Sequence, residues 1–142
     1  MDAFDADVLI YAANAGHPLG RRIRPLIPID PPGGPDEAAG VGSMLLIPEL
    51  MIKPSRQDAQ PEAEALTELL VRLHLLPVDE PTSRLATQFG AVYGLKTVDA
   101  VHLATAVLAG ADRFITNNSR DFPKTITEID ITYPADLPDP GE

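Results

Sequence analysis

The feature that most constrains the chain is its first stretch, Met1 to Ala13, which reads MDAFDADVLIYAA. Two carboxylates, Asp5 and Asp7, lie inside this otherwise apolar run. A run of this kind is typical of a central strand that is covered on both faces. Ligands of open α/β sheets bind in the crevice beyond the carboxyl ends of the strands. We therefore expect Asp5 at a strand exit and Asp7 at the start of the following helix.

The two acids favour different interpretations. Asp is a preferred N-cap residue, so Asp7 is interpreted mainly as the cap of the helix that follows. Asp5 has no comparable local role in the sequence. An ionised carboxylate in a core is costly unless it is paired or binds a metal, so we predict a functional role for Asp5. The alternative is a structural role in which backbone N–H groups hold it.

The chain has 142 residues and no cysteine. This length predicts a single domain with a substantial core. Disulfides, thiolate nucleophiles and cysteine-type zinc sites are excluded, so any bound metal is expected to have oxygen ligands. The sequence contains no apolar window long enough for a membrane span and no signal-peptide pattern, which predicts a cytoplasmic protein.

The formal net charge of −10 is unfavourable for a nucleic-acid-binding protein, because phosphate contacts normally come from a basic surface. Acids gathered around divalent cations are still compatible with such a ligand, since the ion inverts the local charge. The basic residues at 21–24 and at 53–56 are interpreted first as solvated helix faces.

Strand-like and helix-like segments alternate along the chain. This alternation predicts an α/β domain with a mostly parallel sheet of about five short strands flanked by helices. Pro54 is expected to end one helix, and Thr97 to cap another. After the first strand, further strands are predicted at 41–44, 75–78, 113–116 and 129–133. One helix is predicted to begin near residue 7, and the others at 19–27, 44–52, 61–73, 79–94 and 96–110. Residues 28–42 are predicted to form a loop.

Further polar residues fall where this topology brings segments toward the exit of the first strand. Glu49 interrupts an apolar helix and needs a cation nearby. Asp99 lies in the first turn of a helix, where the helix dipole alone also favours an acid. His102 shares a face with Asp99, but a lone histidine among apolar neighbours is interpreted mainly as a buried packing or hydrogen-bonding residue and not as a ligand. The loop 117–121 follows a strand, with a turn or cap role as its alternative.

Four segments, FDADVLIYA, SMLLIPEL, KTVDAVHLATA and FITNNSRDF, together resemble the PIN domain family, and the length is similar to that of the toxin nucleases of VapBC toxin–antitoxin pairs. The resemblance implies a PIN-like, Rossmann-like sheet over residues 1–134. Residues 135–142 are expected to form a flexible acidic and Pro-rich tail. The resemblance also implies a site that binds Mg²⁺ or Mn²⁺ and cleaves RNA.

Matched position by position, the resemblance assigns Asp5, Glu49 and Asp99 as the first three acids of the site. The fourth position is open between Asn118 and Asp121: many relatives have an acid where this chain has Asn118, while others place one before the Phe, as Asp121 is placed here. Thr116 and Ser43 match positions that support the acids by hydrogen bonds.

The resemblance implies an endoribonuclease that uses metal-activated water and no protein nucleophile, leaving 5′-phosphate and 3′-hydroxyl ends. It further implies a small VapB-type antitoxin that covers the acidic pocket, and a homodimer. The RNA backbone would be held by basic residues, with the candidates Arg21, Arg22, Arg24, Lys53, Arg56 and Arg120.

Two alternatives stay open on the sequence. Asp5, Ala6 and Asp7 also resemble the DxD signature of haloacid dehalogenase-type phosphatases, in which Asp5 would be the nucleophile. That family needs a later lysine and acid, for which Lys124 and Asp130 are poorly placed. The second alternative is a catalytically silent PIN-like module that binds RNA or a protein, a hypothesis supported by Asn118 at an acid position.

Overall fold

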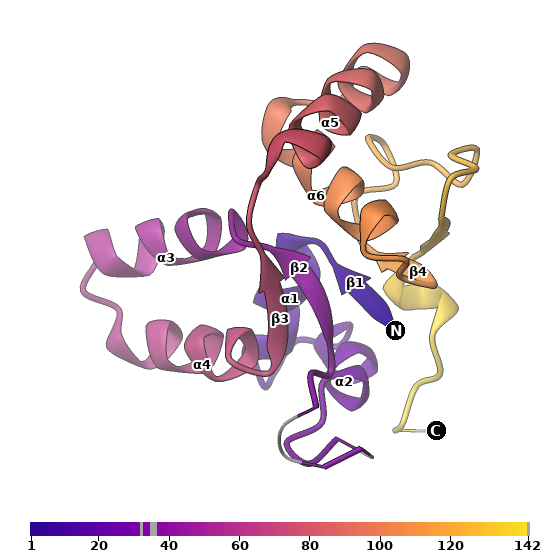
Figure 1. Ribbon diagram of the computed structural model, residues 1–142. Coiled ribbons are helices and arrows are strands. Elements are labelled where there is room, and N and C mark those ends of the chain that lie inside the picture. The colour runs from indigo at the N-terminus through magenta and orange to yellow at the C-terminus, as the bar shows by residue number, and fades with distance from the viewer. Residues whose placement is uncertain (32, 35–36, 142) are drawn as a thin grey trace.

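The structure is a computed structural model and describes residues 1–31, 33–34 and 37–141. Its centre is a sheet of five strands in the order β3-β2-β1-β4-β5 (Figure 1). All neighbouring strands are parallel, which confirms the predicted α/β fold class. The strands are β1 (Asp2–Phe4), β2 (Gly40–Ser43), β3 (Leu73–Leu76), β4 (Arg113–Ile115) and β5 (Asp130–Thr132).

The central position of β1 follows from its apolar residues. Ala3 and Phe4 are both buried, and because successive side chains of a strand point to opposite faces, they serve two different halves of the core. Ala3 packs in a cluster with residues of α5 and α6, and Phe4 packs in a cluster with residues of α1, α3 and α4. The strand is thus covered on both faces, as its continuous apolar run predicts.

The helices connect the strands and cover the two faces. They are α1 (Ala6–Ala13), α2 (Gly20–Ile23), α3 (Leu46–Arg56), α4 (Gln60–Leu70), α5 (Glu80–Tyr93) and α6 (Thr97–Leu108), with 3₁₀ turns η1 (Arg24–Leu26) and η2 (Pro134–Asp136). Figure 1 shows α3 and α4 projecting together from the β3 side of the sheet. In the described part of the chain no single helix is long and apolar enough to cross a membrane; α5 and α6 meet the length and composition test only as a pair bent by 118°.

Three local predictions about helix ends are wrong. The N-cap of α1 is Asp5, whose carboxylate accepts from the Ala6 N–H, and Asp7 lies inside the first turn. The N-cap of α6 is Lys96, and Thr97 is its first helical residue. Pro54 lies inside α3. The helix continues past it because Gln57 N–H still bonds to the carbonyl of Lys53.

Other boundaries differ by a few residues. The predicted helix 19–27 is divided into α2 and η1, since Pro25 lies at the start of the tighter turn. The predicted helix 61–73 ends at Leu70, so β3 begins two residues before its predicted start. Within the predicted loop 28–42, the strand β2 already begins at Gly40, and residues 32, 35 and 36 lie outside the described residues.

The C-terminal segment contacts the rest of the domain. Leu137 is buried in the same cluster as Phe4. The Arg22 guanidinium donates to the carbonyl of Leu137 at 2.7 Å, and Arg21 pairs with Asp139 at 2.8 Å. These contacts hold the described part of the segment against α2. The domain boundary at 134 and the flexible tail stay predictions.

Candidate metal centre

The polar residues gather at the carboxyl ends of the central strands. Asp5 directly follows β1, Thr116 directly follows β4, and Ser43 is the last residue of β2. The Ser43 hydroxyl accepts from the Leu45 N–H at 3.1 Å and so fixes the entry into α3, which carries Glu49. The parallel sheet therefore brings residues from distant parts of the sequence to one edge, as an open α/β sheet is expected to do.

Asp5 is the most buried acid of the site, with 5% of the residue exposed. One carboxylate oxygen accepts from the Ala6 N–H at 2.8 Å, and the other accepts from the Thr116 hydroxyl at 2.8 Å. Burial nevertheless raises the pKa of this carboxyl above its usual range, although His102, Thr116 and the Ala6 N–H oppose the rise. Asp5 is thus held in place but is not fully compensated as an anion.

Asp7 connects α1 with the loop after β4. Its carboxylate accepts from the Val8 N–H at 2.7 Å and from the Asn117 N–H at 3.0 Å. Burial, followed by the nearby charge of Asp5, raises the pKa of Asp7 to about 7. This role differs from the helix cap that the sequence favours, because the bond to Asn117 joins residues 110 positions apart.

Glu49 and His102 meet across the site. Glu49 comes from the first turn of α3, and His102 is a buried residue of α6. The His102 Nε2 and the Glu49 Oε1 lie 3.2 Å apart. Ligand atoms of Asp5, Glu49 and His102 lie within 4.8 Å of one another. The sequence interpretation left His102 as a buried packing or hydrogen-bonding residue, and its burial and its contact with Glu49 agree with that interpretation. The only sign that it lies near the site was the three-residue spacing from Asp99.

Asp99 is half-buried in the first turn of α6. Burial raises its pKa, and the charges of Asp5 and Glu49 raise it further. Asp99 therefore lies within the electrostatic reach of both acids, although it does not belong to the close group of three formed among the described residues.

Asn118 and Asp121 form one hydrogen-bonded turn. The Asn118 amide donates to the Asp121 carboxylate at 2.9 Å, and the Asp121 N–H donates back to the Asn118 carbonyl oxygen at 3.2 Å. The Asn118 N–H also donates to the Thr116 hydroxyl oxygen at 3.1 Å. Since Asp121 adds to the raised pKa of Asp99, the turn lies near the acids. Which of the two side chains completes the site stays a prediction.

This arrangement fits a divalent cation. In the described part of the chain, none of Asp5, Glu49, Asp99 and Asp121 is paired with a lysine or arginine. The raised pKa values of Asp5, Asp7 and Asp99 show that these anions are crowded and poorly solvated, a condition that a bound cation relieves. Carboxylate and amide oxygens are the ligands that Mg²⁺ and Mn²⁺ prefer.

Comparison with known families agrees with this geometry. The PIN domain family model matches residues 3–126. The chain belongs to the PIN domain family. The resemblance inferred from the four sequence segments is therefore confirmed, and the matched region of this PIN domain contains every residue assigned to the site. No curated protein sequence matches the chain.

Solved structures with the same fold include two from toxin–antitoxin systems. A chain of a toxin–antitoxin complex from Klebsiella pneumoniae is 20% identical, with a TM-score of 0.73, and the match covers 94% of this PIN domain and 98% of that chain. A chain of VapBC2 from Rickettsia felis, bound to a DNA fragment from their promoter, is 14% identical, with a TM-score of 0.68 and coverage of 93% and 97%. These likenesses establish the fold.

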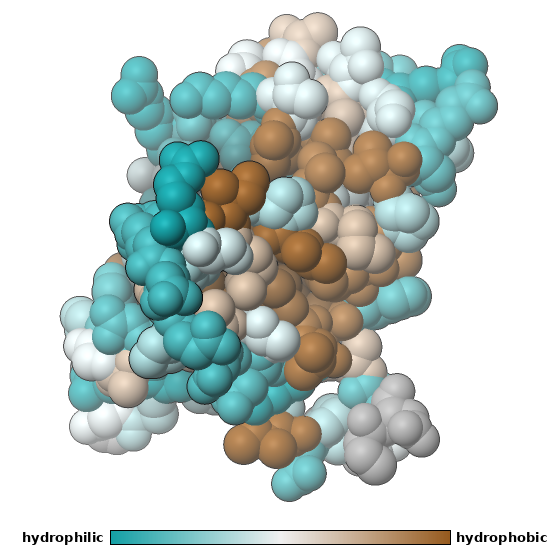
Figure 2. All heavy atoms as spheres, turned by 90° about the vertical axis from the view of Figure 1, so that its left-hand side faces the viewer, coloured by the Kyte–Doolittle hydropathy of each residue, from teal (hydrophilic) through white to brown (hydrophobic). Residues whose placement is uncertain are grey.

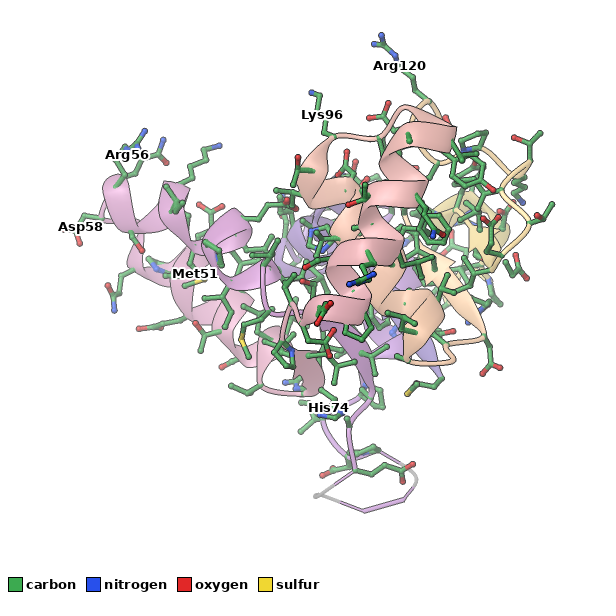
Figure 3. All side chains as sticks on the ribbon, turned by 45° about the horizontal axis from the view of Figure 1, so that its top comes forward. Met51, Arg56, Asp58, His74, Lys96 and Arg120 are labelled. Carbon is green, nitrogen blue, oxygen red and sulfur yellow. The ribbon has the colours of Figure 1, made fainter. Side chains whose placement is uncertain are left out.

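Seven basic residues, the six candidates named from the sequence and Lys96, divide into two sets. Arg21 and Arg22 hold the C-terminal segment, and the Arg24 guanidinium donates to the carbonyls of Ala12 and Asn14, so these three arginines have structural partners. In the described ranges, the remaining four basic residues near the carboxyl edge and on α3 form no ion pair. They are Lys53, Arg56, Lys96 and Arg120. Figure 3 shows Lys96 and Arg120 projecting in the same direction, and Arg56 projecting from the end of α3.

Proposed function

We propose that this PIN domain is a metal-dependent endoribonuclease and the toxin of a type II toxin–antitoxin pair. The observation that carries the proposal is the convergence of Asp5, Glu49 and Asp99 at one sheet edge, where none of them is paired with a lysine or arginine among the described residues. Membership of the PIN family supports the same conclusion.

The chain's own residues would bind and orient the ion. We propose Asp5, Glu49 and Asp99 as ligands, directly or through water, with Asn118 or Asp121 completing the set. When bound, Mg²⁺ or Mn²⁺ supplies a hydroxide at neutral pH and neutralises charge on the phosphate. Thr116 keeps the Asp5 carboxylate in one orientation, since its hydroxyl donates to it. In this proposal the attacking group is water, and no protein side chain acts as the nucleophile.

Two free basic side chains flank the acids and are suited to an RNA backbone. Lys96 precedes Asp99 by three residues, and Arg120 is the neighbour of Asp121. Both project outward at this edge of the molecule (Figure 3). Phosphate contacts of this kind fix the position of the strand without reading its sequence. They would offset the net negative charge where the substrate approaches.

An antitoxin and a second copy of the chain are the proposed protein partners. Figure 2 views the molecule from the side on which α3 and α4 project. A broad apolar area lies beside these two helices in this view. Exposed apolar side chains on α3 and just before it include Met44, Ile47 and Ile52. Exposed apolar patches often mark protein interaction sites. The fold shared with chains of two toxin–antitoxin structures supports a VapB-type partner.

The direct test is incubation of the purified protein with structured RNA and Mn²⁺, beside EDTA and Asp99→Asn controls. We expect cleavage that leaves 5′-phosphate and 3′-hydroxyl ends and that both controls abolish. Cleavage that survives both controls contradicts the proposed chemistry.

The two sequence-based alternatives make different predictions. A haloacid dehalogenase-like phosphatase would hydrolyse p-nitrophenyl phosphate after Asp99→Asn but not after Asp5→Asn. Family membership disfavours it, and Lys124 is already engaged with Asp136 on the surface. A silent binding module, favoured by Asn118, would bind RNA or a protein without any Mn²⁺ heat that depends on Glu49 and Asp99.

A further inference from the structure

We propose that His102 is a positioning residue that holds Glu49 through a hydrogen bond from Nε2, and that it is not itself a metal ligand. The inference rests on the proposed function only in taking Glu49 as a ligand. It assigns a role to a buried histidine that lies among candidate ligand atoms and could otherwise be taken for one of them.

Glu49 is a long, partly exposed acid of the site with little support from its own helix. Both oxygens of Asp5 already accept hydrogen bonds, from Ala6 and Thr116. The Glu49 side chain is 31% exposed, and its one hydrogen bond within the described residues is the contact with His102. A long, flexible carboxylate loses considerable rotamer entropy when it is fixed in a site. A rigid partner that restricts it before the cation binds reduces that cost.

His102 is such a rigid partner. Only 2% of the residue is exposed, and its neighbours Val101 and Leu103 on α6 are buried as well. Because α6 packs against β2 and α5, the imidazole is fixed by the core and not by solvent. Its Nε2 reaches Glu49 at 3.2 Å, across 53 residues of sequence. The contact therefore joins α3 to the helix that also carries Asp99.

The surroundings of the second ring nitrogen of His102, Nδ1, favour a hydrogen-bond donor to Glu49 over a metal ligand. The buried Nδ1 of His102 has no hydrogen-bond partner among the described residues. If Nε2 coordinated a cation, the ring proton would lie on Nδ1 and would be a buried N–H donor without an acceptor, which is costly. Metal-bound histidines normally donate this proton to a carbonyl or carboxylate. If Nε2 instead carries the proton and donates to Glu49, Nδ1 is left as an unpaired acceptor, and buried N–H donors without a partner are rarer in proteins than such acceptors.

The tautomer can be measured on the unaltered protein. Long-range ¹H–¹⁵N NMR distinguishes a protonated Nε2 from a protonated Nδ1, and His102→Gln identifies the His102 signals among the three histidines. We expect the Nε2–H form without metal and after addition of Mg²⁺. A protonated Nδ1, or loss of the Nε2 proton when Mg²⁺ is added, overturns the proposal. This result does not depend on RNA cleavage.

Binding of Mn²⁺ alone tests the positioning role. Removing an outer-shell partner typically weakens metal binding about 10- to 100-fold. We expect a loss of this size in calorimetry of His102→Leu, and recovery of most of it in His102→Gln, whose amide provides a donor at a similar reach. The matched control is His74→Gln, an exposed histidine of β3 at the opposite end of the molecule from Lys96 (Figure 3).

Electron spin-echo envelope modulation spectroscopy of the Mn²⁺-loaded wild type distinguishes a His102 that donates to Glu49 from a His102 that binds the metal directly. Absence of ¹⁴N coupling from an imidazole agrees with a donor, and its presence overturns the proposal. Unchanged Mn²⁺ affinity in folded His102→Leu overturns it as well. If His102→Leu does not fold, the wild-type spectra and His102→Gln decide. A wild type that does not bind Mn²⁺ overturns the proposed function, while the NMR tautomer still tests the bond to Glu49.

Discussion

The two ends of the central strands β1 and β4 both carry acids, but the chain treats them differently. At the amino ends, Asp2 forms a two-point ion pair with Arg113 at 2.9 and 3.0 Å, and Asp112 pairs with the N-terminal amino group. At the carboxyl ends, Asp5 directly follows β1 and is buried without a lysine or arginine partner in the described part of the chain. Among the described residues, Asp2 and Asp112 at the amino ends thus have cationic partners, whereas Asp5 at the carboxyl end has no lysine or arginine partner.

The pKa directions express the same contrast. The N-terminal amino group lowers the pKa of Asp112, so that acid is favoured as an anion. Burial and mutual repulsion raise the pKa values of Asp5, Asp7 and Asp99, so those anions are disfavoured. The carboxyl-end acids are therefore not explained by the stability of the fold. Binding of a divalent cation, as proposed above, would relieve the repulsion among them.

The largest expected effect separates the two ends by activity. Asp5→Asn and Asp99→Asn should each reduce metal-dependent RNA cleavage more than about 100-fold, above the loss typical of outer-shell partners. Asp2→Asn should leave cleavage unchanged, because its partner is an arginine at the opposite end. Initial rates on one RNA at a fixed Mn²⁺ concentration give the ratio. An equal loss of cleavage in Asp2→Asn would contradict the difference between the two ends of the sheet.

A cation should stabilise the fold only through the carboxyl-end acids. At a Mn²⁺ concentration about 100 times its Kd, binding adds about 2.7 kcal/mol, which raises the Tm of a domain of this size by about 8–11 °C. Asp99→Asn should lose most of this rise, whereas Asp2→Asn should retain it. Thermal melts with Mn²⁺ and with EDTA provide the measurement. A rise of the same size in Asp99→Asn would show that Mn²⁺ binds elsewhere.

The pH dependence of the metal-free protein should follow from Asp7. Its folded-state pKa is raised from 3.8 to about 7, so the folded protein holds the proton more tightly than the unfolded chain between these values. Its contribution to stability is therefore greatest below about pH 4 and is lost as the pH rises through about 7.

Asp7→Asn removes this titration and keeps an oxygen that can accept from Asn117. In EDTA, its Tm should exceed that of the wild type by a few degrees at pH 8, since about 1 kcal/mol corresponds to about 3–4 °C here. The difference should shrink toward pH 4. A variant that is less stable than the wild type at pH 8 would contradict the direction of the shift.

The smallest effect is expected at the neutralised end. Asp2→Asn removes one partner of a partly buried, two-point ion pair, for which about 1 kcal/mol is a typical loss. The Tm should fall by about 3–4 °C on that basis. The fall should be similar with Mn²⁺ and with EDTA. A dependence on Mn²⁺ would connect Asp2 with the metal centre and weaken the contrast between the ends.

The sequence predicts the fold and the edge of the sheet where the acids gather, because both depend on local patterns. The apolar run around Ala3 and Phe4 identifies a central strand, and strand exits identify Asp5 and the 117–121 loop. Local preference does not distinguish between two acids that are two positions apart. It therefore selects Asp7 as the cap of α1, where the structure has Asp5.

The remaining differences are long-range contacts. The sequence leaves His102 as a packing or hydrogen-bonding residue and does not identify its partner, because Glu49 is 53 positions away. Arg21 and Arg22 look like a solvent-exposed basic group because their partners, Asp139 and the Leu137 carbonyl, are more than 110 positions away. A one-dimensional pattern carries no information about such pairs, whereas it does carry the periodicity that defines strands and helices.

Calorimetric titration of Mn²⁺ into wild type, Asp2→Asn and Asp99→Asn tests the contrast most directly. If the acids at the carboxyl edge bind Mn²⁺, the wild type should give a heat of binding. This heat should be unchanged in Asp2→Asn and lost in Asp99→Asn. No heat in the wild type, or the same heat in all three proteins, would contradict a divalent metal site at the carboxyl edge of the sheet.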